Sequence, residues 1–233
     1  MEKLPKINIL YEDNHLLVVI KPKNIPVQKD KSNDTDLLSI LKDYLKEKYH
    51  KNGDAYLGLV HRLDRPVSGI MVFAKTSKSA KRLSEQIRKN EIYKEYTAVT
   101  IGKIPKKGTL KDYLIKDNKT NITKVTNKEH GKEARLDYEI LATKNNMNLV
   151  KINLHTGRSH QIRVQFSNIN SPLYGDMKYN KNTKKGESIA LFANKITFIH
   201  PTTKETLTFS SPYPNTYPYN IFTKKKRLKY KIT

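Results

Sequence analysis

A single carboxylate, Asp64, lies in a short segment that is otherwise rich in cationic side chains. This segment, residues 61–65 (HRLDR), joins two apolar runs, and the pattern predicts two strands connected by a charged bend. Most aspartates in such bends are turn residues or surface ion-pair partners. Here the apolar flanks indicate a bend that starts from a rigid core, and we expect the neighbouring arginines to keep Asp64 ionised even where water is partly excluded. Asp64 is therefore the first candidate catalytic residue.

A second motif, residues 157–163 (GRSHQIR), contains another pair of arginines. Its pattern predicts a short helix over His160 to Asn168, capped by Ser159. Arg163 would then lie about one turn into the helix, near free N–H groups and the positive end of the helix dipole, which suits a carboxylate or a phosphate. On spacing alone, an ordinary capped helix with solvent-facing arginines explains the motif equally well.

Tyr96 is the third candidate, in a β-rich run from Ile92 to Ile101 that predicts a strand. A tyrosine in a strand usually packs in the core and extends its hydroxyl to the surface. Alternatively, the ring stacks on a base and the hydroxyl takes part in proton transfer. Spacing leaves both interpretations open.

The chain is strongly basic, with 45 Lys and Arg residues against 22 Asp and Glu, a formal net charge of +23. This balance predicts attraction to the phosphates of a nucleic acid, although a solvated basic surface is the simpler alternative. Only eight of the 45 are arginines, and four of these lie in the two motifs. Because arginine makes planar, bidentate contacts that lysine cannot copy, their retention there suggests a specific role. The four are Arg62, Arg65, Arg158 and Arg163.

Other kinds of site find little support. His61, His155 and His160 lack the spacing of zinc motifs and the chain has no cysteine, so we expect no metal. His61 and Ser68 are not part of a GxSxG nucleophile elbow. Neither a P-loop nor a GxGxxG loop is present, and we therefore expect no cofactor. Without a long apolar run, a signal peptide or an amphipathic helix with a large aromatic face, the sequence predicts a cytoplasmic protein that does not bind membranes.

The remaining pattern predicts one domain over residues 1–222 and a basic tail over 223–233. A hairpin is expected over 7–20, a helix from Asp34 to His50 with its cap among residues 33–36, and a helix from Ser77 to Lys89 capped by Thr76 or Ser77. Further strands are expected at 110–116, 122–126, 134–142, 149–154, 189–199 and 205–209, with a loop at 172–179 and a polar linker at 180–186.

Several segments resemble one family in the order that the family has them. HRLDRPVSG is similar to the HRLDxxTSG motif of the RluA-type pseudouridine synthases, and GRSHQIRVQF to their arginine motif. ILYEDNHLLVVIKPKNIPV, KEYTAVTIG, PLYGDMKY and IALFANKITFIHP resemble other segments of that family. The resemblance implies an α+β fold of the pseudouridine synthase type, with a largely antiparallel mixed sheet, flanking helices and a central catalytic cleft. Since the resemblance begins by Ile7, we expect no S4 domain.

The resemblance also implies roles for individual residues. Asp64 would be the catalytic aspartate, Arg163 its ion-pair partner and Tyr96 the ring stacked on the target uracil. Arg62 would support the RNA and Ile162 would pack near the base. His61, Arg65, Arg158 and His160 complete the expected RNA-binding set. The family commonly has Thr at the position of Val67 and His at those of Gln165 and Phe192, and these departures should affect packing or RNA contacts.

The implied reaction is the isomerisation of uridine to pseudouridine in ribosomal or transfer RNA, by a monomer and with the target base flipped out. Two rival functions remain at this stage. A non-catalytic RNA-binding or ribosome-assembly protein would explain the charge, but it gives Asp64 no reason to lie among arginines. A phosphodiesterase using His61 and His160 would cleave the RNA strand instead of modifying it.

Overall fold

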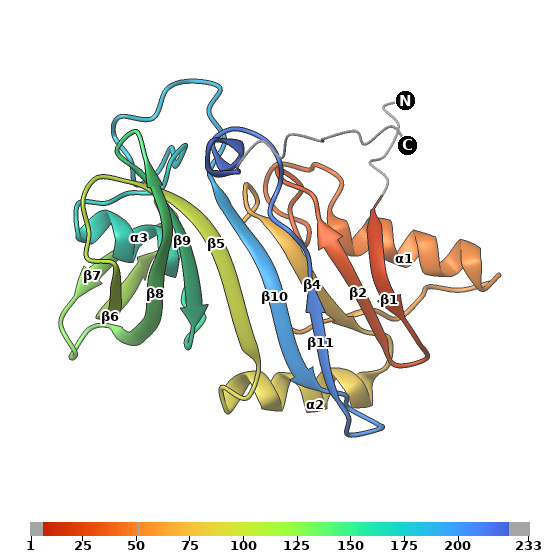
Figure 1. Ribbon diagram of the computed structural model, residues 1–233. Helices are drawn as coiled ribbons and strands as arrows, with labels where there is room; N and C mark the ends of the chain where they lie inside the picture. Colours follow the sequence, from red (N-terminus) through yellow and green to blue (C-terminus); the bar gives the residue numbers. More distant parts are fainter. Residues whose placement is uncertain (1–6, 51, 224–233) are drawn as a thin grey trace, which may run out of the picture.

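A single mixed sheet of eleven strands forms the frame of the protein. The computed structural model describes residues 7–50 and 52–223. The main path of the sheet runs β1-β2-β4-β10-β5-β9-β8-β6-β7, with β3 paired to β4 and β11 paired to β10. The N-terminal hairpin therefore lies at one edge and the β6–β7 hairpin at the other, as Figure 1 shows. The predicted α+β class, with its largely antiparallel sheet, is confirmed.

The predicted elements are found, with ends that differ by a few residues. The strands are β1 (Asn8–Glu12), β2 (Leu16–Lys21), β3 (Gly58–Leu59), β4 (Ser68–Ala74), β5 (Tyr93–Ile101), β6 (Lys107–Asp117), β7 (Ile122–Thr126), β8 (Lys132–Lys144), β9 (Met147–Leu154), β10 (Leu191–Ile199) and β11 (Thr206–Ser210). The helices are α1 (Leu37–Lys48), α2 (Ser77–Arg88), α3 (Gln161–Asn168) and the 3₁₀ helix η1 (Tyr219–Phe222).

The two halves of the sheet meet at a short parallel pairing between β4 and β10. Its register joins Ser68 to Phe192 and Gly69 to Ala193, whereas the other strand pairs are antiparallel. A Cβ atom at Gly69 would stand 2.4 Å from the backbone N and O of Ala193, and Gly69 has a φ of +134°. Glycine is required here because it tolerates this φ and lets the strands approach. Ala193 is also paired with Tyr96, so Gly69, Ala193 and Tyr96 stand in one row across three strands.

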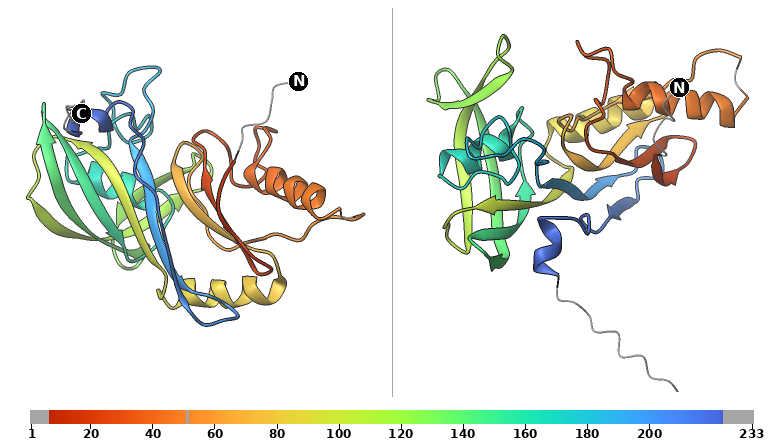
Figure 2. Two further views of the ribbon diagram at one scale, coloured as in Figure 1. Left: turned by 45° about the vertical axis from the view of Figure 1, so that its right-hand side comes forward. Right: turned by 90° about the horizontal axis from the view of Figure 1, so that it is seen from above.

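Both faces of the central strands are buried, which explains the nearly continuous apolar runs in β2 and β4. Alternate residues of β2 enter different cores: Leu17 and Val19 pack in one, and Leu16 and Val18 in the other. The first core includes the apolar faces of α1 and α3, and the second includes Leu83 of α2. Figures 1 and 2 show α1 beside the N-terminal strands, α3 beside β6–β9 and α2 across one end of the sheet.

The caps of the helices agree with the sequence in two cases out of three. Asp36 caps α1 through its side chain, which accepts a hydrogen bond from the backbone N–H of Ser39, and Thr76 caps α2 in the same way. The predicted Ser159 cap of α3 is wrong. The capping position is His160, with a left-handed φ of 52° and no side-chain cap bond.

Two expectations about the ends and surroundings of the chain have different outcomes. The boundary between a domain ending at 222 and a tail from 223 stays a prediction, because residues 224–233 lie outside the described part. Within the described ranges, no helix combines the length and apolar character that a membrane span requires.

Candidate active site

Asp64 and Arg163 lie face to face, although 99 residues separate them in the chain. The Nη1 atom of Arg163 donates to Oδ2 of Asp64 at 3.0 Å. Asp64 comes from the bend between β3 and β4, whereas Arg163 is the third residue of α3. The side chain of Asp64 keeps 27% of its surface exposed, and that of Arg163 keeps 5%. The pair is thus anchored in the protein on the arginine side and reachable from solvent on the aspartate side.

A second aspartate, Asp176, fixes the other edge of the same guanidinium. Nε and Nη2 of Arg163 donate to the two carboxylate oxygens of Asp176 at 2.8 and 2.6 Å, and the Asp176 side chain is fully buried. Burial alone would lower the pKa of Arg163, but hydrogen bonds and charge from Asp176, together with those of Asp64, raise it above its ordinary value. The bidentate contact orients the guanidinium and directs Nη1 to Asp64.

Tyr179 connects this pair to His160. Its ring lies 5.2 Å from the Arg163 guanidinium, and its hydroxyl is 2.7 Å from Nδ1 of His160. The other ring nitrogen of His160, Nε2, is 3.8 Å from the Asp64 carboxylate. Burial lowers the pKa of His160 to about 4 even though the charge of Asp64 opposes the shift. At neutral pH the imidazole is therefore uncharged, and Arg163 supplies the positive charge next to Asp64.

Tyr96 lies in the middle of β5 with 7% of its surface exposed, packed in the core that also contains Leu63, Val67 and Ile162. Burial and, secondarily, the negative charge of Asp64 raise the pKa of its hydroxyl above the ordinary value. The hydroxyl is thus protonated at neutral pH and lies close enough to Asp64 to feel its charge. Ile162, the predicted neighbour of the base, is also buried.

The bend that contains Asp64 is held by a buried lysine and a half-buried histidine. Nζ of Lys21 donates to the carbonyl oxygens of Pro22, Arg65 and Val67 at 2.8, 2.9 and 2.8 Å, and burial lowers the pKa of Lys21 to about 7. On the other side of Asp64, Nε2 of His61 accepts from the backbone N–H of Val72 at 3.1 Å, and burial lowers the pKa of His61 to about 4. His61 is thus engaged in holding the strand next to the bend.

Among the described residues, the arginines nearest to Asp64 in the sequence form no ion pair with it, and Arg163 does so instead; the expectation that they keep it charged stays a prediction. Arg65 turns away to form ion pairs with Asp34 and, at 3.9 Å, Asp30. Arg62 is exposed. Arg158 is exposed as well, and its Nε donates to the carbonyl of Glu133 at 2.8 Å. Their predicted contacts with RNA stay predictions.

Three residues of this arrangement are absent from the predicted set: Lys21, Asp176 and Tyr179. Lys21 ends an apolar strand just before Pro22, an unusual place for a charge, and this was the available signal. Asp176 and Tyr179 belong to the PLYGDMKY segment, which the sequence analysis predicted as a loop and matched to a segment of the family without assigning a role to either residue. Among the described residues, no group of three or more His, Asp or Glu is arranged to hold a metal ion.

The predicted cleft at Asp64 stays a prediction. Two pockets on the described surface have volumes of about 310 and 380 Å³; the first lies along β5, β8 and β9 and the second along β6, β8 and β9. They include Tyr93, Asn153 and His155 but none of Asp64, Tyr96 and Arg163.

Comparison with known proteins decides the family. A family model described as RNA pseudouridylate synthase matches residues 15–168, which include Asp64, Tyr96 and Arg163. The chain belongs to this family. As a pseudouridine synthase it is an isomerase that acts on RNA. It is 35% identical over 213 residues to the uncharacterized RNA pseudouridine synthase YhcT of Bacillus subtilis, covering 90% of this chain and 69% of that protein.

Other pseudouridine synthases give the same result. The chain is 32% identical over 226 residues to ribosomal large subunit pseudouridine synthase D of Buchnera aphidicola, covering 89% of this chain and 69% of that one. The fold matches human RNA pseudouridylate synthase domain containing 4 with a TM-score of 0.75 and 22% identity, over 89% of this chain and 88% of the human one. The resemblance seen in the sequence is therefore confirmed at the level of family and fold.

Proposed function

We propose that this synthase isomerises uridines of large-subunit ribosomal RNA, with Asp64 as the catalytic carboxylate. The observation that carries the proposal is the 3.0 Å contact between Asp64 and a guanidinium that a second, buried aspartate holds in place. The choice of RNA rests on relatives whose names refer to the ribosomal large subunit, and transfer RNA is the second candidate.

The reaction breaks the bond between N1 of uracil and C1′ of the ribose, turns the base and joins C5 to C1′. An ionised carboxylate serves such a step by attacking C1′, by stabilising positive charge there or by assisting departure of the base. Arg163 and the partly exposed position suit Asp64 to these roles. The proton on C5 must then leave, and in this proposal the hydroxyl of Tyr96 or a water molecule relays it.

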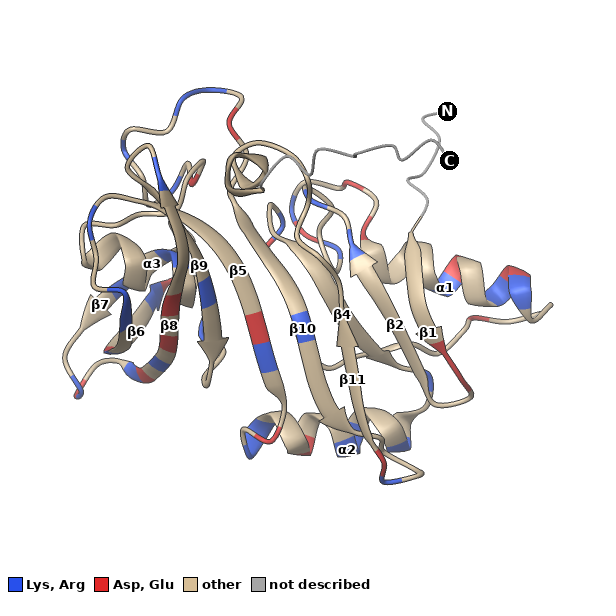
Figure 3. Cartoon of the chain, viewed as in Figure 1, with Lys and Arg blue, Asp and Glu red and all other residues tan. Residues whose placement is uncertain are grey.

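Reaching Asp64 requires a uridine outside its helical stack. Base flipping costs a few kcal/mol, and least in loops and bulges, so unpaired uridines are the expected targets. The Tyr96 ring supplies the surface on which the uracil stacks, and Ile162 packs beside it. The basic surface supplies affinity for phosphates. Figure 3 shows its lysines and arginines spread over α1, α2 and the β6–β9 side of the sheet.

The first test follows release of tritium from C5 of uridine in an unmodified transcript of large-subunit ribosomal RNA. We expect Asp64→Asn to abolish release while the affinity for the transcript stays near that of the wild type. Asp34→Asn, which removes an exposed aspartate that pairs with Arg65 instead of Arg163, is the matched control and should keep tritium release. Substantial tritium release by Asp64→Asn would remove Asp64 from its proposed role.

The same assay separates the rival functions. A protein that only binds RNA releases no tritium at any concentration. A phosphodiesterase shortens the transcript on a denaturing gel. This last option has little support, because His61 accepts a backbone hydrogen bond through Nε2 and the pKa values of both His61 and His160 are lowered to about 4.

A further inference from the structure

Lys94 is a partly buried cation beside the site that the mechanism above does not use. It lies two residues before Tyr96 in β5. Because successive side chains of a strand alternate, Lys94 and Tyr96 point to the same face, about 7 Å apart along the strand. The intervening residue, Glu95, points to the other face, where it bonds to Asn194. Lys94 therefore extends on the face from which Tyr96 approaches Asp64.

The ammonium group of Lys94 lies between the two segments that supply the catalytic pair. Its Nζ atom would be 3.7 Å from a Cβ atom placed on Gly157, in the loop that leads to α3 and Arg163. Its charge also lowers the pKa of His61, in the bend that contains Asp64. The position is thus at the edge of the site, at the junction of β5, the bend and the loop.

No counter-charge holds Lys94 in this place. Burial lowers its pKa, and no carboxylate among the described residues offsets the shift. A lysine that folds partly out of water without an ion pair costs free energy unless an anion binds to it. Lys21, the other buried lysine of this region, differs because three carbonyl oxygens satisfy it.

Gly157 keeps one side of the ammonium open. Apart from Gly157 and its two chain neighbours, Nζ of Lys94 is the one atom of the described residues within 4 Å of the place where its Cβ would stand. A methyl group at this position would therefore fit the free protein at ordinary contact distance. The same methyl group would occupy space that a ligand of the ammonium needs.

We propose that Lys94 and the open side of Gly157 form a binding site for a backbone phosphate next to the target uridine. The inference rests on the proposed function, because Tyr96 and Asp64 mark where the uridine lies. The site takes a phosphodiester because the ligand must be anionic, must approach from solvent and must be part of the chain that delivers the base. Bound there, the phosphate fixes the RNA chain at a distance of about one two-residue repeat of β5 from the reacting ribose.

The test measures how the affinity for a fluorescent oligouridylate depends on salt, in an Asp64→Asn background that prevents turnover. One phosphate contact contributes about 0.7 to the slope of log K against log salt for single strands. We expect Lys94→Met to lower the slope by about that amount and to weaken binding about tenfold, as for one charge-assisted contact. Lys94→Arg, which keeps the charge, should restore most of the slope.

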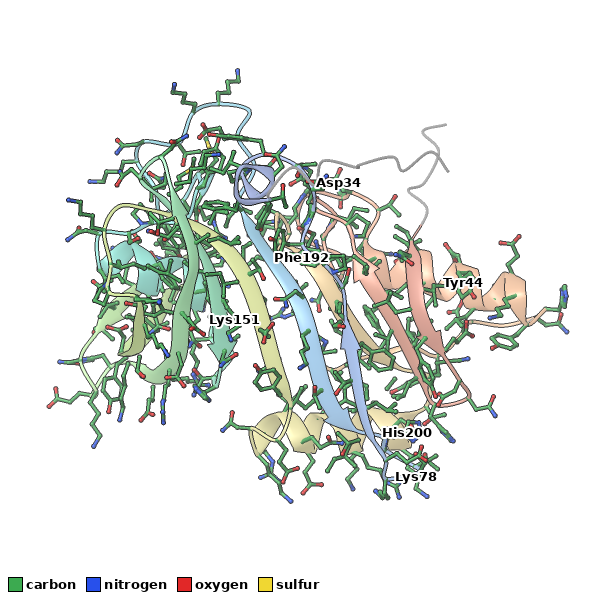
Figure 4. The ribbon with its side chains drawn as sticks, in the orientation of Figure 1. Asp34, Tyr44, Lys78, Lys151, Phe192 and His200 are labelled. Atoms are coloured by element: carbon green, nitrogen blue, oxygen red, sulfur yellow. The ribbon has the colours of Figure 1, made fainter. Side chains whose placement is uncertain are left out.

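Two further variants separate this site from general charge. Lys78→Met removes one exposed charge at the start of α2, labelled in Figure 4, and should lower the slope much less than Lys94→Met does. Gly157→Ala keeps every charge and should melt at the wild-type temperature, yet bind about as weakly as Lys94→Met. An unchanged slope in Lys94→Met, or wild-type affinity in Gly157→Ala, would overturn the proposal. The proposed function is tested separately by tritium release from the protein that retains Asp64. That result does not depend on the outcome of the salt experiment.

Discussion

Two clusters in this protein contain the same residue types, one arginine and two aspartates, in different surroundings. At the surface, Arg65 contacts Asp30 and Asp34, with side chains 40%, 43% and 52% exposed. At the site, Arg163 contacts Asp64 and Asp176, with side chains 5%, 27% and 0% exposed. Solvent-exposed ion pairs contribute little and are screened by salt, whereas buried pairs depend on each partner. The two clusters therefore differ in burial: one links exposed side chains at the surface, and the other holds the Arg163 guanidinium in a fixed orientation beside Asp64.

The largest effect should come from Asp176→Asn. The change leaves the buried Arg163 guanidinium without its bidentate partner, and breaking a buried pair in this way typically costs about 3–5 kcal/mol. We expect a large drop in the free energy of unfolding, measured by urea denaturation, together with loss of tritium release. If the variant had the same urea midpoint of unfolding as the wild type, Asp176 would not be the residue that holds Arg163.

Arg163→Lys tests the geometry of the same cluster with its charge kept. Lysine cannot contact Asp176 in a bidentate manner and Asp64 at the same time. We therefore expect turnover to fall by about a hundredfold, on the order of 2.7 kcal/mol in the barrier, with a smaller change in unfolding. The fall in turnover should appear in the measured kcat. Turnover equal to that of the wild type would make Arg163 a structural residue only.

Acid should lower the free energy of unfolding, because two histidines of the site have lowered pKa values. The folded-state pKa values of His61 and His160 are about 4, below the ordinary value of 6.5. The unfolded chain thus binds more protons between these values, so stability is fully present above about pH 6.5 and is lost as pH falls through 4. Urea midpoints at pH 7 and 4.5 should show the fall. His61→Gln should reduce it, and His130→Gln, at an exposed histidine, should not.

The smallest effect should come from the surface cluster. Arg65→Gln removes ion pairs in which the partners are well exposed, so we expect a urea midpoint within error of the wild type and a much smaller loss of tritium release than in Arg163→Lys. Its backbone carbonyl, which accepts from Lys21, is unaffected by the change. A loss of activity comparable to that of Arg163→Lys would show that burial does not separate the two clusters.

Much of the fold could be predicted because each signal is local. Alternating and continuous apolar runs gave the strands, and Asp36 and Thr76 mark helix starts through contacts three residues away. The pairing of Asp64 with Arg163 could be expected only through the resemblance of whole motifs, since no local rule joins residues 99 positions apart.

The other features of the site depend on tertiary contacts that leave no signal in the local sequence. Nothing in the segment around Arg65 tells whether it turns to Asp64 or to Asp34. The left-handed start of α3 at His160 arises where the imidazole contacts Tyr179, not from a local cap. Asp176 lies in a loop, and its role appears only when the fold brings it under Arg163.

The contact between Gly69 and Ala193 has a consequence for how this active site can vary. Ala193 lies between Gly69, five residues after Asp64, and Tyr96 in the same row of the sheet. Any larger residue at position 69 would overlap the backbone of Ala193, so β4, which follows Asp64, would have to shift relative to β10 and the paired strand β5 with Tyr96. The spacing between Asp64 and Tyr96 therefore depends on a residue whose side chain is a single hydrogen atom.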